Sequence, residues 1–149
     1  AAWLKSVLRG TPCRTYMADM KVQIALAESW VYPDVLVSCD ERDRAPDADL
    51  AKRHPVLVVE VLSSSTGAYD RGRKFELYRS LPSLREYLLI EQDRMQVDLF
   101  RRNADDRWEL YPAGRADTLQ LASLGLQLPV ALIYDDIEFE PEPPPPPIK

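Results

Sequence analysis

The sequence predicts an α/β fold built on a mixed central sheet, and three neighbouring segments carry that prediction. Residues 56–62 form an almost continuous apolar run rich in valine, which is typical of a strand covered on both faces. Residues 70–81 repeat apolar side chains at helical spacing and end before Pro82. Residues 85–90 then return to a strand pattern. A strand, a helix and a second strand in this order predict a right-handed crossover between parallel strands.

Shorter patterns predict the elements around this unit. Gly10 and Pro12 end a short helical pattern near the start of the chain. A polar turn at residues 91–94 predicts that the chain folds back after 85–90 into an antiparallel meander. Residues 119–133 mix short apolar stretches with turn residues, so no element is assigned there. The expected elements are a helix at 3–9, strands at 21–27, 34–39 and 95–100, and an extension of the meander at 108–111.

Length and composition indicate one globular domain. The chain has 149 residues, enough to bury a core, and we expect a single domain over residues 1–138 followed by an extended, disordered proline-rich tail at 139–149. Because the chain does not begin with Met, the N-terminal part of the domain is expected to be incomplete. No apolar run approaches the roughly 20 residues that span a bilayer, and no signal peptide is recognisable, so no membrane partner is expected.

Cysteine, histidine and charge content narrow the possible chemistry. Cys13 and Cys39 are too few for a disulfide framework, and we interpret them as reduced core thiols of a cytoplasmic protein rather than as a disulfide or a nucleophile. His54 precedes a proline and is interpreted as a loop residue. The net charge of −5 argues against a generally basic surface, although a local basic patch for nucleic acid remains compatible with it. Such a cluster occurs on the predicted helix at Arg71, Arg73, Lys74 and Arg79.

Glu60 is the most unusual residue because it lies inside the apolar run at 56–62. An ionised carboxylate costs several kcal/mol in such a place unless a cation, hydrogen bonds or a proton compensate it. Asp34, at the start of another predicted strand, and Lys74, on the following helix, are the natural partners. The alternative is that Glu60 is a protonated core residue without a chemical role.

Asp34, Glu60 and Lys74 together suggest a metal-dependent active site. Neighbouring strands lie about 4.8 Å apart, so carboxylates at similar heights can converge on one cation, and Mg²⁺ accepts as few as one or two carboxylates. Metal-bound water is a nucleophile for phosphodiester hydrolysis, and a nearby ammonium stabilises the transition state. Asp70 and Tyr78 lie four residues before and after Lys74, so the three share one helix face. The alternative is an ordinary acid–lysine surface pair.

This series of residues resembles the Uma-type (Uma-two) family of putative restriction endonucleases, which are small bacterial proteins of the PD-(D/E)XK nuclease superfamily. The resemblance covers roughly residues 3–137. It implies a restriction-endonuclease-like fold, with a mixed central sheet flanked by helices and an added antiparallel meander. The residues that carry it are Tyr32-Pro33-Asp34-Val35, Val58-Val59-Glu60-Val61-Leu62-Ser63, Ser65-Thr66, Asp70, Lys74, Tyr78 and Glu86-Tyr87.

The resemblance also implies an activity, that of a Mg²⁺- or Mn²⁺-dependent endonuclease (a hydrolase) that cleaves phosphodiester bonds of DNA. Asp34 matches the aspartate of the first half-motif, and Glu60 matches the acidic residue of the second. These two carboxylates, with the backbone of Val61, are the expected metal ligands. A homodimer is a further expected partner, because a symmetric pair of sites would cleave both strands.

One departure from the family pattern concerns the catalytic lysine. It usually lies two residues after the acidic residue, where this chain has Leu62. We expect the ammonium to come from Lys74 on the following helix, with Asp70 and Tyr78 positioning it or the substrate. The alternative is a catalytically inactive nuclease-fold protein that acts as a DNA-binding or protein-interaction module.

Overall fold

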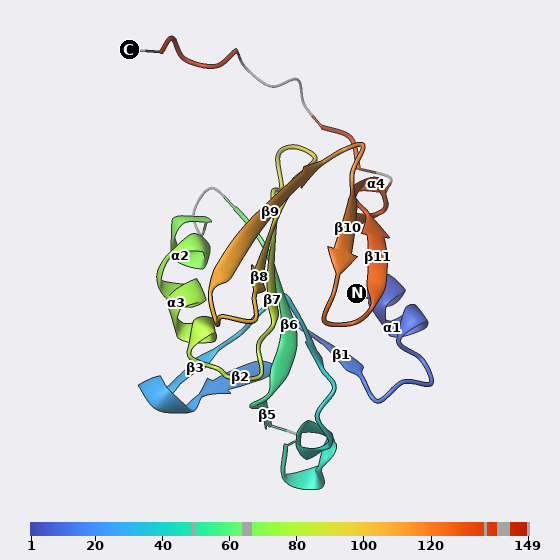
Figure 1. The fold of residues 1–149 in the computed structure, drawn as a ribbon, viewed down its shortest axis with the longest axis vertical. Coiled ribbons are helices and arrows are strands. Elements are labelled where there is room, and N and C mark those ends of the chain that lie inside the picture. The colour runs from blue at the N-terminus through green and yellow to red at the C-terminus, as the bar shows by residue number, and fades with distance from the viewer. Residues whose placement is uncertain (49, 64–66, 136, 140–143, 149) are drawn as a thin grey trace.

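A mixed sheet lies at the centre of the fold (Figure 1). The computed structural model describes residues 1–48, 50–63, 67–135, 137–139 and 144–148. The central strands are β1 (Arg14–Met17), β4 (Val35–Ser38), β6 (Pro55–Val61), β7 (Glu86–Ile90), β8 (Gln96–Arg102) and β9 (Trp108–Gly114). Within the described residues they form one sheet in the order β1-β4-β6-β7-β8-β9. β6 and β7 are parallel and the other neighbours are antiparallel, which confirms the predicted mixed α/β fold.

Smaller elements surround this sheet. A second sheet, in the order β3-β2-β5, contains β2 (Lys21–Ile24), β3 (Ser29–Val31) and β5 (Ala51–Lys52). A hairpin pairs β10 (Thr118–Leu121) with β11 (Leu126–Pro129). The α-helices are α1 (Ala2–Val7), α2 (Gly67–Arg71), α3 (Arg73–Arg79) and α4 (Val130–Ile133), and the 3₁₀ turns are η1 (Ala25–Ala27), η2 (Glu41–Arg44) and η3 (Pro46–Ala48).

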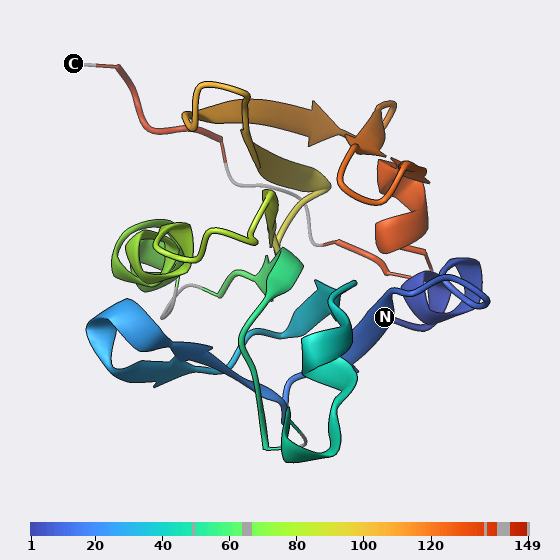
Figure 2. The same ribbon diagram turned by 60° about the horizontal axis from the view of Figure 1, so that its bottom comes forward.

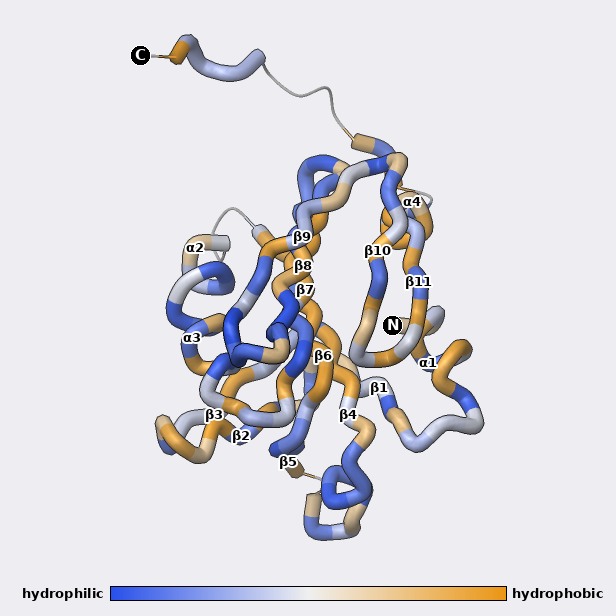
Figure 3. Tube along the Cα trace, viewed as in Figure 1, coloured by the Kyte–Doolittle hydropathy of each residue, from blue (hydrophilic) through white to orange (hydrophobic). Residues whose placement is uncertain are grey.

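Both faces of the central sheet are covered, which explains the apolar run of β6. α2 and α3 lie on one face, whereas α1, α4 and the β10–β11 hairpin lie on the other (Figures 1 and 2). Leu57 and Val59 of β6 pack into the core on the α1 face, while Val58 packs into the core on the α3 face. β6 and β7 therefore run through the middle of the molecule as largely hydrophobic strands (Figure 3). Because side chains alternate along a strand, Glu60 shares the α3 face with Val58.

The predicted crossover is confirmed, although its helix is divided. β6 and β7 are parallel, with Glu60 opposite Leu89, and the connection between them contains α2 and α3. The predicted single helix over 70–81 breaks at Gly72, whose ψ of −96° is not helical. A Cβ at Gly72 would lie 3.2 Å from the carbonyl oxygen of Ala68, so glycine fits this break closely.

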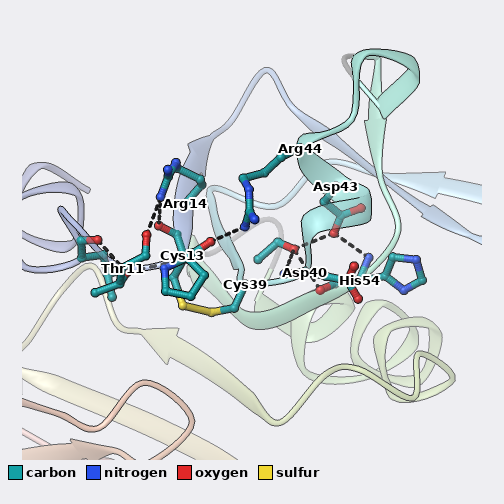
Figure 4. Close-up of a disulfide and its surroundings, with 11 residues drawn as sticks. Thr11, Cys13, Arg14, Cys39, Asp40, Asp43, Arg44 and His54 are labelled. Carbon is teal, nitrogen blue, oxygen red and sulfur yellow. Dashed lines mark hydrogen bonds between the residues drawn. A yellow bond between two sulfur atoms is a disulfide. The ribbon is translucent and has the colours of Figure 1, made fainter.

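β1 is a strand that the sequence patterns do not predict, and it changes the interpretation of the cysteines. Arg14 pairs with Ser38 in the antiparallel β1–β4 register, so the next pair along the ladder is Cys13 and Cys39. These two residues form a disulfide (Figure 4). The prediction of reduced core thiols is therefore wrong. The expectation of a cytoplasmic protein loses the support that it took from those thiols.

Regular structure and side-chain packing continue further toward the C-terminus than the sequence patterns predict. The β10–β11 hairpin and α4 occupy the segment to which no element is assigned from sequence. Phe139, the first residue of the predicted tail, lies against Tyr134 with ring centroids 5.4 Å apart. Residues 144–148 are exposed and have no regular secondary structure, while the prediction for 140–143 and 149 lies outside the described residues. No helix in the described part of the chain is long and apolar enough to cross a membrane.

Asp43 joins the loop between β4 and β6 to both strands. Its side chain is 1% exposed. Oδ2 accepts hydrogen bonds from the Ser38 hydroxyl at 2.6 Å and from the backbone N–H of His54 at 2.9 Å, and Oδ1 accepts one from the N–H of Arg53 at 2.9 Å. Because Ser38 ends β4 and His54 precedes β6, this carboxylate fixes the relative position of the two strands at the ends opposite Asp34 and Glu60.

We predict that Asp43→Ala lowers the free energy of unfolding by about 3 kcal/mol, because the substitution leaves three donors without their acceptor. Urea unfolding followed by circular dichroism measures the change. Asp47→Ala is the matched control, since Asp47 is an exposed residue of the same loop, and it should change stability by less than about 0.5 kcal/mol. A loss for Asp43→Ala as small as that of the control would contradict the prediction.

Candidate active site

Glu60 meets a compensating cation on α3. The Glu60 side chain is buried, and the Nζ of Lys74 lies 2.8 Å from its Oε1. The hydroxyl of Tyr78 donates a longer hydrogen bond, of 3.4 Å, to the same oxygen. Lys74 and Tyr78 lie one helical turn apart on α3, so both reach Glu60 from the same face. The structure therefore brings these three predicted residues together.

Asp34 lies beside the same part of β6. The antiparallel register of β4 and β6 pairs Val35 with Val59, and one step further along it places Asp34 opposite Glu60. Asp34 Oδ2 accepts a hydrogen bond of 2.7 Å from the backbone N–H of Val61. Glu60 therefore has a second carboxylate beside it, as the metal-site hypothesis requires, and the charge of Asp34 raises the pKa of Glu60.

Lys74 also contacts two groups besides Glu60. It donates a hydrogen bond of 3.1 Å to the carbonyl oxygen of Tyr32, and its Nζ lies 3.7 Å from Asp70 Oδ1. The ammonium thus links the start of β4, β6 and α2. The Tyr32 carbonyl is a part of the site that sequence reasoning misses, because a backbone group carries no residue-type signal. Its one sequence cue is that it lies two residues before Asp34.

Burial dominates the electrostatics of Glu60. Burial raises the pKa of the Glu60 carboxyl to about 7. The hydrogen bond and charge of Lys74 lower this pKa, whereas the charges of Asp34 and Asp70 raise it further. Burial and the nearby Glu60 charge also raise the pKa of the Tyr78 hydroxyl above its usual range, so Tyr78 stays a neutral donor. Glu60 and Asp70 lie 2.8 and 3.7 Å from the Lys74 Nζ, and the Asp34 charge also acts on Glu60. The acidic groups near Glu60 therefore outnumber the one ammonium and favour a cation when ionised.

Among the described residues, two carboxylate oxygens have no partner and could contact such a cation. Glu60 uses Oε1 for both of its contacts, and Asp34 uses Oδ2, so Oε2 and Oδ1 accept no hydrogen bond from the described residues. In the parts of the chain that the structure describes, no three His, Cys, Asp or Glu side chains are grouped to hold a metal ion. A set of two carboxylates suits Mg²⁺, which keeps several waters, better than Zn²⁺, which prefers histidine and thiolate ligands.

The predicted basic cluster is largely used within the protein. Arg71 forms ion pairs with Asp98 and Glu91, both at 2.8 Å, and Arg73 pairs with Glu76 at 3.0 Å. Because these arginines have acidic partners, the cluster offers a nucleic acid less free positive charge than the sequence suggests.

Glu86 and Tyr87, which end the motif series, lie on opposite faces of β7 and have different roles. The Tyr87 hydroxyl donates a hydrogen bond of 2.8 Å to the carbonyl oxygen of Asp70 and so holds α2 next to Lys74. Glu86 points to the opposite face, where it accepts the N–H of Ser123 at 2.7 Å and pairs with Arg101 at 3.1 Å. Glu86 therefore anchors the β10–β11 hairpin rather than the candidate site.

Comparison with known proteins supports the same class of fold. The structure is similar to the crystal structure of a putative nuclease belonging to DUF820 from Anabaena variabilis, with a TM-score of 0.70 and 14% identity over 87% of this chain and 73% of that one. The Uma2 family model, described as "Putative restriction endonuclease", matches residues 1–131. The chain therefore belongs to the Uma2 family, and the resemblance inferred from its motifs is confirmed.

Two relatives come from Synechocystis sp., and both are described as uncharacterized proteins. The first, slr1290, is 42% identical over 132 residues, which cover 89% of this chain and 68% of the relative. The second, sll1609, is 39% identical over 95 residues, which cover 64% of this chain and 54% of the relative. The chain thus spans between about half and two thirds of their lengths.

The raised pKa of Glu60 predicts a specific pH dependence of stability. The folded protein holds the Glu60 proton up to a pH of about 7, whereas the unfolded chain releases it near 4.5. The folded state therefore binds more protons in this window, and its stability falls as pH rises through it. Above about pH 7 both states are ionised and the loss is complete.

We predict that Glu60→Gln removes this dependence. Between pH 4.5 and 7, wild type in chelator-treated buffer should lose on the order of 3 kcal/mol of unfolding free energy relative to the variant. Urea unfolding at a series of pH values measures the difference. Parallel pH profiles of the two proteins would show that Glu60 ionises normally in the folded state.

Proposed function

We propose that this protein is a Mg²⁺- or Mn²⁺-dependent endonuclease that hydrolyses phosphodiester bonds of DNA. The observation that carries the proposal is the convergence of Asp34, Glu60 and Lys74, from three separate elements, at one end of β6. The family description supports a nuclease activity, and DNA is the substrate expected of a restriction-endonuclease-like protein. The fold shared with a putative nuclease is compatible with this activity.

Asp34 and Glu60 would hold the cation through Oδ1 and Oε2, which accept no hydrogen bond from the described residues. The carbonyl of Val61 is a suitable third ligand, because the N–H and C=O of one strand residue point to the same edge and the N–H of Val61 points to Asp34. A cation with these ligands retains positions for water and a phosphate oxygen. When bound, it supplies an activated water and offsets charge on the phosphate.

Lys74 is proposed as the catalytic ammonium. In the structure it pairs with Glu60, and its hydrogen bond to the Tyr32 carbonyl ties it to the segment that leads into β4. A cation on Glu60 would weaken the attraction between Glu60 and Lys74, which frees the ammonium to stabilise negative charge on a phosphate oxygen. Asp70 and Tyr78 are proposed as positioning residues, because one lies 3.7 Å from the Lys74 Nζ and the other donates to Glu60.

A second candidate function is a catalytically inactive module that binds DNA or a protein. The observation that favours it is the Lys74–Glu60 pair itself, because a neutralised Glu60 needs no cation for stability. The position of the usual strand lysine is Leu62, which is buried in the core against α3. This candidate predicts no cleavage by the wild-type protein.

We predict that the protein nicks supercoiled plasmid in the presence of Mg²⁺ or Mn²⁺ and that Asp34→Asn reduces the rate by roughly 100-fold or more. The amide oxygen of asparagine can still accept the Val61 N–H, so this variant removes charge with little change in structure. Lys74→Met should cause a loss of similar size, and thermal melting verifies that each variant is folded.

Asp105→Asn and Lys5→Met are the matched controls, since both residues are exposed and lie outside the site. They should nick plasmid at the wild-type rate. Equal rates for wild type and Asp34→Asn would contradict the assignment of the site, and an inactive wild type would favour the binding module.

A further inference from the structure

A basic hollow lies beside the Cys13–Cys39 disulfide, at the opposite end of β4 from Asp34. It has a volume of about 440 Å³ and lies between α1, the turn that follows it and β1. Cys13 lines this hollow, together with Lys5, Arg9, Arg14 and Thr15, whereas Cys39 does not. A molecule in the hollow would therefore meet the disulfide from the side of Cys13.

The hollow carries positive charge without a counter-charge. Its lining includes three cationic residues and no acidic one. Lys5 and Arg9 take part in no ion pair within the described residues, and Arg14 donates to neutral carbonyl oxygens, those of Thr11 at 2.7 Å and Cys13 at 3.0 Å (Figure 4). Three cations that line one hollow and have no acidic partner among the described residues favour an anionic ligand.

The carboxylate on the other side of the disulfide is already neutralised. Asp40, next to Cys39, forms an ion pair of 2.7 Å with Arg42. The backbone N–H of Arg42 also donates a hydrogen bond to the Asp40 carboxylate. Arg44 approaches from the same side and donates to the carbonyl oxygen of Pro12, just before Cys13 (Figure 4). The surroundings of Cys13 are therefore electropositive, a condition that stabilises thiolates and speeds exchange at a sulfur atom.

We propose that this hollow binds a small anionic thiol, such as a carboxylate-bearing peptide thiol, and that Cys13 is the sulfur that it attacks. The thiolate forms a bond to Cys13 Sγ, the Cys13–Cys39 bond breaks, and its electron pair leaves on Cys39 Sγ, which takes a proton from water. A second thiolate attacks the ligand sulfur of the mixed disulfide and releases Cys13, which is protonated in turn. Two thiols are oxidised to one disulfide, and the protein gains two electrons and two protons.

The reduction would release the covalent tie of an edge strand. β1 lies at the edge of the central sheet, and β4 is its neighbour there. After reduction, β1 would be held by the hydrogen bonds of the β1–β4 ladder, from Arg14 to Met17, and by the packing of Tyr16, without a covalent link to β4. This inference concerns a separate site and does not depend on the proposed nuclease activity.

The charge of the reducing thiol tests the proposal on the wild-type protein. Reduction by glutathione, which is anionic, is compared with reduction by cysteamine, which is cationic, at equal thiolate concentration and low salt. The reduced cysteines are alkylated and counted by intact mass. The ratio of the glutathione rate to the cysteamine rate should be roughly fivefold or more higher for this protein than for a small neutral disulfide. High salt should abolish this glutathione excess.

A double variant identifies the hollow as the source of that preference. Lys5→Gln with Arg9→Gln should remove the glutathione excess, while Arg94→Gln with Arg107→Gln, which changes exposed residues elsewhere, should retain it. An excess that is absent in wild type, or unchanged by the first pair of substitutions, would overturn the proposal.

Single-cysteine variants identify the attacked sulfur. With oxidised glutathione, Cys39→Ser should form the adduct on Cys13 roughly fivefold faster than Cys13→Ser forms it on Cys39. Equal rates would overturn the assignment of Cys13. The wild-type comparison does not depend on the folding of these variants.

Discussion

The ion pair between Glu60 and Lys74 is the interaction on which the rest of the candidate site depends. Glu60 is 2% exposed in the middle of a hydrophobic sheet, and Lys74 approaches it to 2.8 Å from α3. Removing one partner of such a pair leaves an uncompensated buried charge, which typically costs about 3–5 kcal/mol. The pair therefore ties the crossover helix to β6 and also concentrates charge at one point of the sheet.

The topology explains why the other groups meet at that point. Parallel strands β6 and β7 require a crossover, and its helices cover the face to which Glu60 points. β4 runs antiparallel to β6, so the start of β4, with Asp34, lies beside the end of β6, with Glu60. Asp43 fixes the opposite ends of the same two strands. Register and loop structure together thus place Asp34 opposite Glu60, while α3 brings Lys74 to Glu60.

Much of this arrangement is predictable from sequence, and the failures have physical reasons. The apolar run of β6 and the helical spacing from Lys74 to Tyr78 are strong local signals, and both predicted the correct element. β1 is a four-residue edge strand without a buried alternation, so neither it nor the Cys13–Cys39 pairing could be predicted from pattern. The ion pairs of Arg71 depend on residues some twenty or more positions away, which spacing within a helix cannot show.

We propose that Asp34 and Glu60 form a cation site that Lys74 completes. A crystal structure with Mn²⁺ at millimolar concentration, analysed by anomalous scattering, tests it most directly. We expect a manganese ion coordinated by Asp34 Oδ1, Glu60 Oε2 and the Val61 carbonyl, with Lys74 displaced from its bond to Glu60. A map without an anomalous peak between the two carboxylates, and with the Lys74–Glu60 pair intact, would contradict it.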